Sequence, residues 1–253
     1  MLDILLPAFF LSLVLLGIHS YFGIEIIRKG IIFTDLAVGQ MAALGAAISL
    51  LFFDGQYLYI TSLIFSLLAG LLIAFASRKV RHLEAFIGLM YAFGLSGVFI
   101  LLSKSPNGAE KFQDLMASDI LFTPSSEITK TAILYSLLGI FIYIFNKKTT
   151  GFLKEVLFFI TFSVTVTSSV KLAGVLVIFA LLIGPAMIAL NINRGKLVIN
   201  AWIIGTIINL IAISVSYNFD FPTGYTLVCF HALIAGLCFL IFEKKSSKEQ
   251  KTN

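Results

Sequence analysis

The chain has 253 residues, of which 59% are hydrophobic and only 12% are charged. Soluble domains are about half apolar and about one-quarter charged, and disordered chains lack the aromatic content of the 25 phenylalanines found here, so both classes are excluded. The net charge of +5 comes from basic residues scattered between apolar runs, whereas nucleic-acid binding requires a continuous basic patch. The composition therefore indicates a membrane protein with no nucleic-acid partner.

Apolar runs long enough to cross a lipid bilayer recur along the whole chain. A membrane-spanning helix needs about 17–25 apolar residues to cross a hydrocarbon core of about 30 Å. Nine runs meet or approach this length, at residues 4–24, 31–53, 57–77, 85–103, 127–146, 155–170, 172–191, 197–217 and 223–242. Only Lys171 separates the sixth run from the seventh, so these are either two spans or one broken, partly re-entrant element. We predict one all-α domain over residues 1–253, a polytopic bundle of eight to nine transmembrane segments with a break near Lys171.

The distribution of lysine and arginine predicts the orientation of these spans. The loops and tail at 25–30, 78–84, 147–154, 192–196 and 243–253 hold fourteen of the 18 basic residues, which are Arg28, Lys29, Arg78, Lys79, Arg81, Lys147, Lys148, Lys154, Arg194, Lys196, Lys244, Lys245, Lys248 and Lys251. The other four, Lys104, Lys111, Lys130 and Lys171, fall on the opposite side. Because cytoplasmic loops are enriched in basic residues, we expect nine crossings, an external N-terminus and a solvated cytoplasmic tail at 243–253. The chain starts without a basic stretch or a small-residue cleavage site, so we expect the first span to be retained.

The longest polar stretch, residues 104–126, lies on the expected outer side. Between Pro106 and Pro124, apolar residues recur at helical spacing over 109–120. This pattern predicts a short helix lying on the membrane surface, near the outer gate of any transport path.

Sequence motifs for nucleotide binding and for hydrolysis are missing from the chain. There is no G-x-x-x-x-G-K-[ST] loop to hold nucleotide phosphates, since the Gly195-Lys196 pair is followed by Leu197. There is also no H-E-x-x-H, C-x-x-C or G-x-S-x-G sequence, so a membrane protease or hydrolase would lack its metal ligands or its nucleophile. These absences favour a transporter without catalytic residues or a bound cofactor over an enzyme.

Polar side chains inside apolar spans are costly and commonly mark a transport path. Four are candidates for contact with a metal ion: Asp35, Gln40, His19 and His231. Asp35 shares a helix face with Gly39, Ala42 and Ala46, and such small side chains let another helix approach closely. If the first two spans are antiparallel neighbours, His19 lies at the depth of Asp35 and can pair with it. Ordinary structural hydrogen bonds are the alternative for the carboxylate and for both histidines.

Four residues in the second half of the chain predict a helix break or gate: Lys171, Gly174, Gly184 and Pro185. Lys171 and Gly174 follow a run of hydroxyl side chains at 165–169, and hydroxyls can satisfy carbonyls freed by a break in a membrane helix. Pro185 removes a hydrogen-bond donor and is expected to interrupt the next span. Broken helices line the cargo site of many transporters, whereas a kink that only aids packing is the alternative for Gly184 and Pro185.

Several segments, in order along the chain, resemble the permease subunits of ABC importers for metal ions. They are 30–45 (GIIFTDLAVGQMAALG), 84–88 (EAFIG), 105–110 (SPNGAE), 166–176 (VTSSVKLAGVL) with Pro185 and Ala186 beyond it, and 220–224 (DFPTG). The resemblance implies a multi-pass protein of the bacterial inner (cytoplasmic) membrane that imports zinc, manganese or iron. It also implies a homodimer that works with a separate cytoplasmic ATP-binding subunit, which hydrolyses the ATP, and with an extracytoplasmic metal-binding protein.

Two departures from the family pattern affect the predicted site. Many family members carry a histidine four residues after the aspartate, and this chain has Gly39 there with Gln40 beside it. One carboxylate and one amide form a weaker, oxygen-rich site, so the ion would be held loosely or by His19 or His231.

The second departure concerns the contact with the ATPase. Family members carry an acidic-Ala-Gly coupling helix after the fifth span, and segment 146–155 of this chain is shorter. Either the contact is remodelled or ATP coupling is altered. The residues expected to form a remodelled contact are Lys147, Lys148, Gly151, Arg78 and Arg81.

The function that the sequence favours is a homodimeric permease subunit for divalent metal, with zinc ahead of manganese and iron because histidine is available. Two other classes stay open. One is a stand-alone secondary carrier in which Asp35 and His19 relay protons. The other is a non-transporting membrane scaffold, which the short loop at 146–155 would explain.

Overall fold

Ten α-helices make up almost the whole chain. The computed structural model describes residues 2–118, 120–193 and 195–251, and within these ranges it contains no strand. The helices are α1 (Leu2–Lys29), α2 (Thr34–Phe52), α3 (Leu58–Lys79), α4 (Leu83–Leu102), α5 (Gly108–Met116), α6 (Ser125–Lys148), α7 (Gly151–Ala173), α8 (Val175–Ile192), α9 (Leu197–Phe219) and α10 (Thr223–Lys251), with a 3₁₀ turn at Ile120–Phe122. Nine of them, all except α5, are long and apolar enough to cross a membrane. The predicted all-α bundle of nine spans is therefore confirmed for the described residues.

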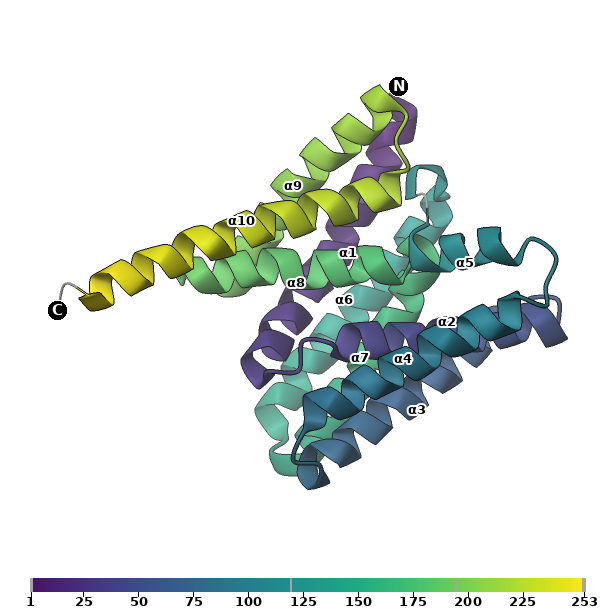
Figure 1. Ribbon diagram of the computed structural model, residues 1–253, viewed down its shortest axis with the longest axis horizontal. Helices are drawn as coiled ribbons and strands as arrows, with labels where there is room; N and C mark the ends of the chain where they lie inside the picture. The colour runs from purple at the N-terminus through teal and green to yellow at the C-terminus, as the bar shows by residue number, and fades with distance from the viewer. Residues whose placement is uncertain (1, 119, 194, 252–253) are drawn as a thin grey trace.

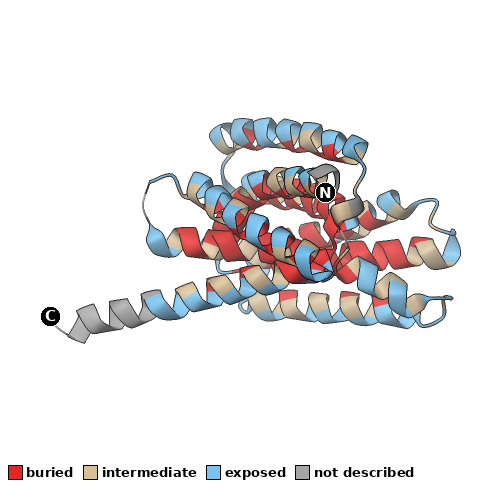
Figure 2. Cartoon of the chain, turned by 90° about the horizontal axis from the view of Figure 1, so that it is seen from above, coloured by how far each residue is buried: buried red, intermediate tan, exposed pale blue. Residues whose placement is uncertain are grey.

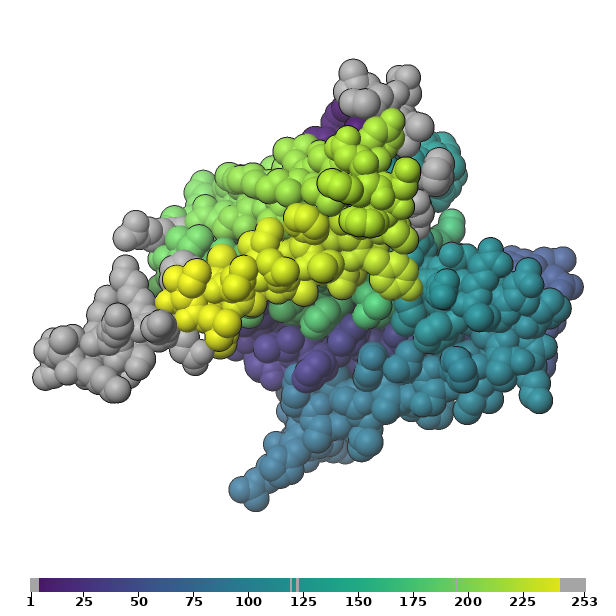
Figure 3. Space-filling model, turned by 45° about the horizontal axis from the view of Figure 1, so that its top comes forward, coloured from purple at the N-terminus to yellow at the C-terminus, as the bar shows by residue number. Residues whose placement is uncertain are grey.

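The helices form two packed groups joined by longer central helices. One group is α2, α3 and α4, with α7 packed along α3, and the other is α8, α9 and α10. Helix α1 crosses between them and packs against α8, α9 and α6 (Figure 1). In the space-filling view, α9 and α10 (green to yellow) and α3 and α4 (blue to teal) form the two sides of the visible face (Figure 3).

Burial differs sharply between the inner and the outer helices. In the most apolar stretch of each helix, 78% of the residues of α2 and 67% of those of α7 are buried. The same share is only 22% in α4 and in α6. Figure 2 shows this as red inner ribbons beneath outer ribbons that are blue and tan. The outer helices expose leucine, isoleucine and phenylalanine side chains, which is the surface that a lipid environment requires. Helix α2, which carries Asp35 and Gln40, is thus enclosed by one chain alone.

The helix break lies at Gly174, between α7 and α8. Gly174 has φ +85° and ψ 163°, a conformation that is essentially restricted to glycine. A β-carbon at this position would also lie 2.7 Å from the backbone nitrogen of Ala117. The sixth and seventh predicted spans are therefore two separate helices that turn at a single glycine.

The predicted interruption at Gly184 and Pro185 is wrong, because α8 continues through both residues as one helix. Proline removes only one ladder hydrogen bond, and the close packing of α8 against α1, α9 and α10 holds the helix together. The Pro185 ring lies close to Gly205 of α9, where an added β-carbon would come within 2.9 Å of its Cγ. Both residues pack against neighbouring helices, Gly184 next to His231 and Pro185 next to Gly205, as the alternative interpretation expects.

The outer segment forms the predicted short helix, α5, although it ends at Met116 rather than near residue 120. The Ser118 amide donates a hydrogen bond of 3.0 Å to the carbonyl oxygen of Ala173. Gly224, at the start of α10, packs against the backbone of Ala117 and Ser118. The segment therefore covers the turn between α7 and α8.

The C-terminal segment that was predicted as a solvated tail has a helical backbone as far as the structure describes it. Helix α10 continues without a break to Lys251, so the backbone of 243–251 extends the last span as a helix. Arg194, which was placed among the cytoplasmic basic residues, lies outside the described residues.

Candidate functional site

Asp35 lies in the first turn of α2 and is almost completely enclosed. Only 1% of its surface is exposed, and neither carboxylate oxygen has a hydrogen-bond partner among the residues that the structure describes. Helix α2 starts three residues later than predicted. Asp35 is therefore in the first turn, at the N-terminal end of the helix, rather than several residues inside it. This end is held against α4, because the Phe33 amide donates to Glu84 Oε1 over 3.1 Å. A buried carboxylate without a partner costs several kcal/mol, which points to a role other than stability.

The small-residue face of α2 is open near its middle and closed at Gly39. Ala42 and Ala46 line an enclosed cavity of about 20 Å³ that also touches Ser62 and Lys171. At Gly39, one helical turn from Asp35, an added β-carbon would lie 2.9 Å from Cγ1 of Val175. The space beside Gly39, where the resemblance led us to look for a histidine, is therefore filled by α8. The cavity and Asp35 lie on the same helix face and are separated by Val175.

Gln40 joins α2 to the outer segment. Its amide nitrogen lies 3.3 Å from the sulfur of Met116, at the end of α5, while its amide oxygen has no partner among the described residues. Gln40 follows Asp35 by five positions and so points to a different side of α2. The structure does not bring the two side chains together as a pair of ligands. Met116 was not predicted as a site residue, because its contact with Gln40 spans 76 positions.

His19 does not pair with Asp35, so this expectation is wrong. Its Nδ1 lies 2.7 Å from the carbonyl oxygen of Leu15, and its Nε2 lies 3.2 Å from the hydroxyl of Ser169 on α7. The expectation assumed that α1 and α2 are packed side by side. Instead α1 packs against α8, α9 and α6, which turns His19 toward α7.

His231 is on α10 and is buried against α8 and α9. Its Nε2 lies 2.7 Å from Oδ1 of Asn209, and the absence of a side chain at Gly184 leaves room for its ring. His231 therefore belongs to the contact between the C-terminal helices. No group of three or more histidine, cysteine, aspartate or glutamate side chains that could hold a metal ion occurs among the described residues.

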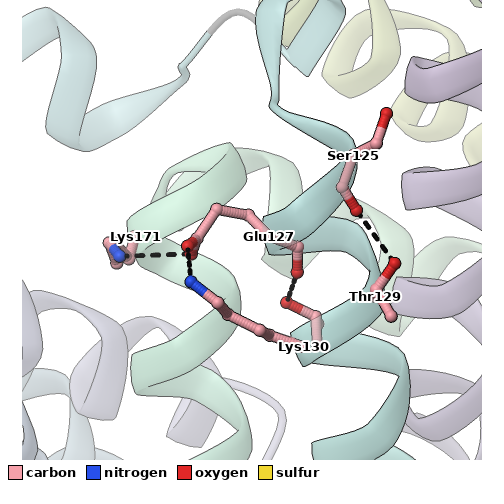
Figure 4. Close-up of polar contacts among 6 residues, drawn as sticks. Ser125, Glu127, Thr129, Lys130 and Lys171 are labelled. Carbon is pink, nitrogen blue, oxygen red and sulfur yellow. Dashed lines mark hydrogen bonds and ion pairs between the residues drawn. The ribbon is translucent and has the colours of Figure 1, made fainter.

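Lys171 stands between an outward pocket and the enclosed cavity on α2. The outward pocket has a volume of about 280 Å³, and it shares Lys171 and Tyr59 with the smaller cavity. The Lys171 amine lies 3.4 Å from one carboxylate oxygen of Glu127, and the Lys130 amine lies 2.9 Å from the other. Figure 4 shows both amines directed at this carboxylate, one from α7 and one from α6 (Figure 4). The arrangement places a fixed positive charge at the entrance to the cavity.

The hydroxyl side chains at 165–169 form hydrogen bonds within α7 and to neighbouring helices. Within the described part of the chain, they do not bond to carbonyl oxygens freed at the helix break. The Thr165 and Ser169 hydroxyls donate to carbonyl oxygens of their own helix. The Thr167 and Ser168 hydroxyls also donate within α7, and both contact neighbouring helices, Thr167 through Ser66 and Ser168 through Tyr135. These hydrogen bonds hold α3, α6 and α7 in register.

The residues predicted to contact an ATPase lie at the ends of α3, α6 and α7. The Arg78 guanidinium is 4.1 Å from the centre of the Phe152 ring, next to Gly151 at the start of α7. Only Thr149 and Thr150 separate α6 from α7, so this chain has no separate helix in that loop. Arg81 and Lys148 are exposed, whereas the Lys147 amine lies over the Tyr143 ring of its own helix.

Comparison with known proteins agrees with this fold. The family model described as the ABC 3 transport family matches residues 1–242. The manganese transport system membrane protein MntC of Listeria innocua is 25% identical, over 90% of this chain and 87% of its own length. A probable iron transport system membrane protein of Haemophilus influenzae is 23% identical, over 96% and 91%.

The structural comparison gives the same result for the fold. PsaBC from Streptococcus pneumoniae, solved in complex with Fab, superposes with a TM-score of 0.76 at 19% identity, covering 93% of this chain and 91% of that one.

A membrane protein encoded in the ycf23-apcF intergenic region of Cyanophora paradoxa, itself uncharacterised, is 26% identical over 88% of this chain and 84% of its own length. Since the family model covers nearly every residue of the chain, the protein belongs to the ABC 3 transport family.

Proposed function

We propose that the chain is the membrane subunit of an importer that moves a divalent metal ion across the bacterial inner membrane. In this proposal two copies form the permease, a cytoplasmic ATP-binding subunit supplies the energy, and an extracytoplasmic protein delivers the ion. The observation that carries the proposal is Asp35, a buried carboxylate without a described partner on a helix that the chain encloses. Such a group inside a membrane protein is a functional site by default.

Manganese is the metal that we propose, ahead of zinc and iron. The sequence favoured zinc because histidine is available, but the ring nitrogens of His19 already contact α1 and α7, and His231 contacts Asn209. The oxygens that stay without a described partner on α2 belong to Asp35, Gln40, Thr34 and Ser49. Carboxylate, carbonyl and hydroxyl oxygens suit manganese better than zinc. The names of the two relatives described above refer to manganese and to iron transport, which supports the same choice.

The transport path that we propose follows the small-residue face of α2. The ion would pass Lys171 and Tyr59, enter the cavity at Ala42 and Ala46, and reach Asp35 when α8 moves Val175 away from Gly39. A site made of one carboxylate holds the ion weakly, which is acceptable where the ion must also leave. In the structure the path is closed at Gly39, as expected of a conformation between outward and inward opening.

The surface that we propose for the ATPase combines the ends of α3 and α7. Arg78, Arg81, Gly151 and Lys148 lie in or beside the turns at 80–82 and 149–150, and the Arg78–Phe152 contact fixes two of these elements to each other. A loop of two residues cannot form a coupling helix, so the helix ends themselves would transmit the movement.

The test of the proposed function is metal uptake into proteoliposomes that contain the chain with its ATPase and its binding protein. We expect uptake that requires ATP, with manganese transported faster than zinc. Uptake by the chain alone under an imposed pH gradient would identify a secondary carrier instead. A chain that binds no ATPase and moves no metal would be a scaffold, and either result would contradict the proposal.

Lys171→Gln is expected to increase metal leakage in the absence of ATP, because the substitution removes the positive charge that repels a cation at the cavity entrance. The matched control is Lys130→Gln, since Lys130 contacts the same Glu127 carboxylate but does not line the cavity. Exposed ion pairs contribute about 0–1 kcal/mol, so both variants should fold normally. The measurement is manganese entry into liposomes without nucleotide, and equal leakage in the two variants would exclude Lys171 as the barrier.

A further inference from the structure

A wide groove lies between α1 and α6 and plays no part in the proposed transport path. Its volume is about 600 Å³, within the range of about 300–1,000 Å³ of pockets that take small molecules. Trp202 of α9 closes one side, and its indole nitrogen donates to the carbonyl oxygen of Leu13 over 3.1 Å. Most of the lining is apolar, so the groove suits a hydrocarbon chain.

Two glycines form an open part of the groove. A β-carbon added at Gly17 of α1 or at Gly139 of α6 would have no atom within 4 Å. Both glycines line the groove, and neither is needed for close packing of the helices within one chain. The absence of two side chains therefore widens the groove where α1 and α6 face each other.

The only amine among the described residues of the groove, Lys147, lies at one end together with the Asn146 amide. Asn146 donates to the Tyr21 hydroxyl over 2.8 Å, and the Lys147 amine donates to the Tyr143 hydroxyl while lying 4.2 Å from the centre of its ring. This end belongs to the side that the lysine and arginine distribution places in the cytoplasm. The groove is thus apolar along its length and cationic at the expected cytoplasmic surface.

The charge of Lys147 is not matched by a neighbouring acid. Among the described residues no carboxylate forms an ion pair with Lys147, whereas Glu25 pairs with Arg28 and Glu155 pairs with Lys29 nearby. A positive charge at the end of an apolar groove on the cytoplasmic side is the arrangement that binds anionic lipid headgroups. A second copy of the chain would cover the amine with one of its exposed apolar helix faces and leave the charge uncompensated.

We propose that this groove is a binding site for one anionic phospholipid of the cytoplasmic leaflet. One acyl chain lies over Gly17 and Gly139, and the phosphate contacts the Lys147 amine, with Asn146 and Tyr21 beside it. The site also explains why Lys147 is turned onto Tyr143 rather than toward the surface that we propose for the ATPase.

Native mass spectrometry of the full-length chain in detergent tests this proposal. After removal of co-purified lipid, the chain is titrated with phosphatidylglycerol or with phosphatidylcholine. We expect one phosphatidylglycerol per chain, bound about fivefold more tightly than phosphatidylcholine, since one lysine near an anionic surface contributes about 1 kcal/mol. No retained lipid, or equal binding of both lipids, would overturn the proposal.

Matched variants separate the groove from the rest of the surface. Gly139→Leu places a side chain in the groove, where an added β-carbon meets no atom within 4 Å, and should remove the bound lipid. Gly236→Leu on α10, where an added β-carbon also meets no atom within 4 Å, should keep it. Lys147→Gln should abolish the preference for phosphatidylglycerol, and Lys148→Gln, outside the groove, should preserve it. Equal effects within either pair would contradict the site. Conversion of a dimer to monomers by Gly139→Leu would assign the groove to a second copy instead.

Discussion

Asp35→Asn is expected to abolish metal transport while leaving the protein at least as stable as the unmodified chain. The asparagine side chain has nearly the same shape but lacks the negative charge that attracts a cation. Removing groups that only support a metal ligand already costs about 10–100-fold in affinity or activity, so loss of the carboxylate itself should lower uptake by about 100-fold. Stability should not fall, because the carboxylate is buried without a partner among the described residues and a buried charge is costly.

The control for this experiment is Asp54→Asn. Asp54 lies exposed in the turn after α2, with φ +50°, a conformation that asparagine tolerates as well as aspartate. Both variants lose one negative charge, and only the first should lose transport. The measurements are manganese uptake in proteoliposomes and thermal unfolding in detergent. An Asp35→Asn protein with full uptake would remove Asp35 from the path, and one that is strongly destabilised would show that the carboxylate is structural.

Gly174→Ala is expected to destabilise the fold more than any other single methyl addition discussed above. The backbone conformation of Gly174 costs about 1–3 kcal/mol for a residue with a side chain. In addition, the new β-carbon would lie 2.7 Å from backbone atoms of Met116 and Ala117. Overpacking of this kind destabilises the folded state by about a further 1–3 kcal/mol. We therefore expect a clearly lower unfolding temperature, together with faster proteolysis of the outer segment, whose residues Met116 to Ser118 pack on this turn.

Gly236→Ala is the matched control, since it adds the same methyl group within a helix where no atom lies within 4 Å. Replacing glycine inside a helix should stabilise it by about 0.5–1 kcal/mol. The two variants should therefore shift the unfolding temperature in opposite directions. Identical unfolding temperatures would mean that the turn between α7 and α8 is not as constrained as the structure indicates.

The hydrogen-bond partners of the buried polar residues show why side-chain roles were harder to predict than helices. The sequence identified Asp35, His19 and His231 as polar residues within apolar spans, and all three are buried. It did not reveal that His19 contacts Ser169, 150 positions away, or that His231 contacts Asn209. Each contact depends on which helices are neighbours, and helical spacing within a span carries no information on that.

The glycine and proline residues give the same contrast. Gly174 was predicted at a break because two apolar runs meet there, and α7 indeed ends at Ala173. Pro185 was predicted to interrupt its span, but α8 is continuous through it. A proline within a helix costs one hydrogen bond, and the packing of α8 against three other helices compensates for that loss, which sequence alone does not show.

The sequence by itself determined the class of the protein, the eight to nine membrane-spanning helices and their approximate positions. Each span must satisfy its own backbone hydrogen bonds and match the thickness of the bilayer, so its length and composition are local properties. Only the tertiary structure decided which polar groups meet, that α8 closes the face of α2 at Gly39, and that α1 and α6 leave a groove ending at Lys147. These features result from helices packing on one another, where shape rather than hydrophobicity selects the neighbour.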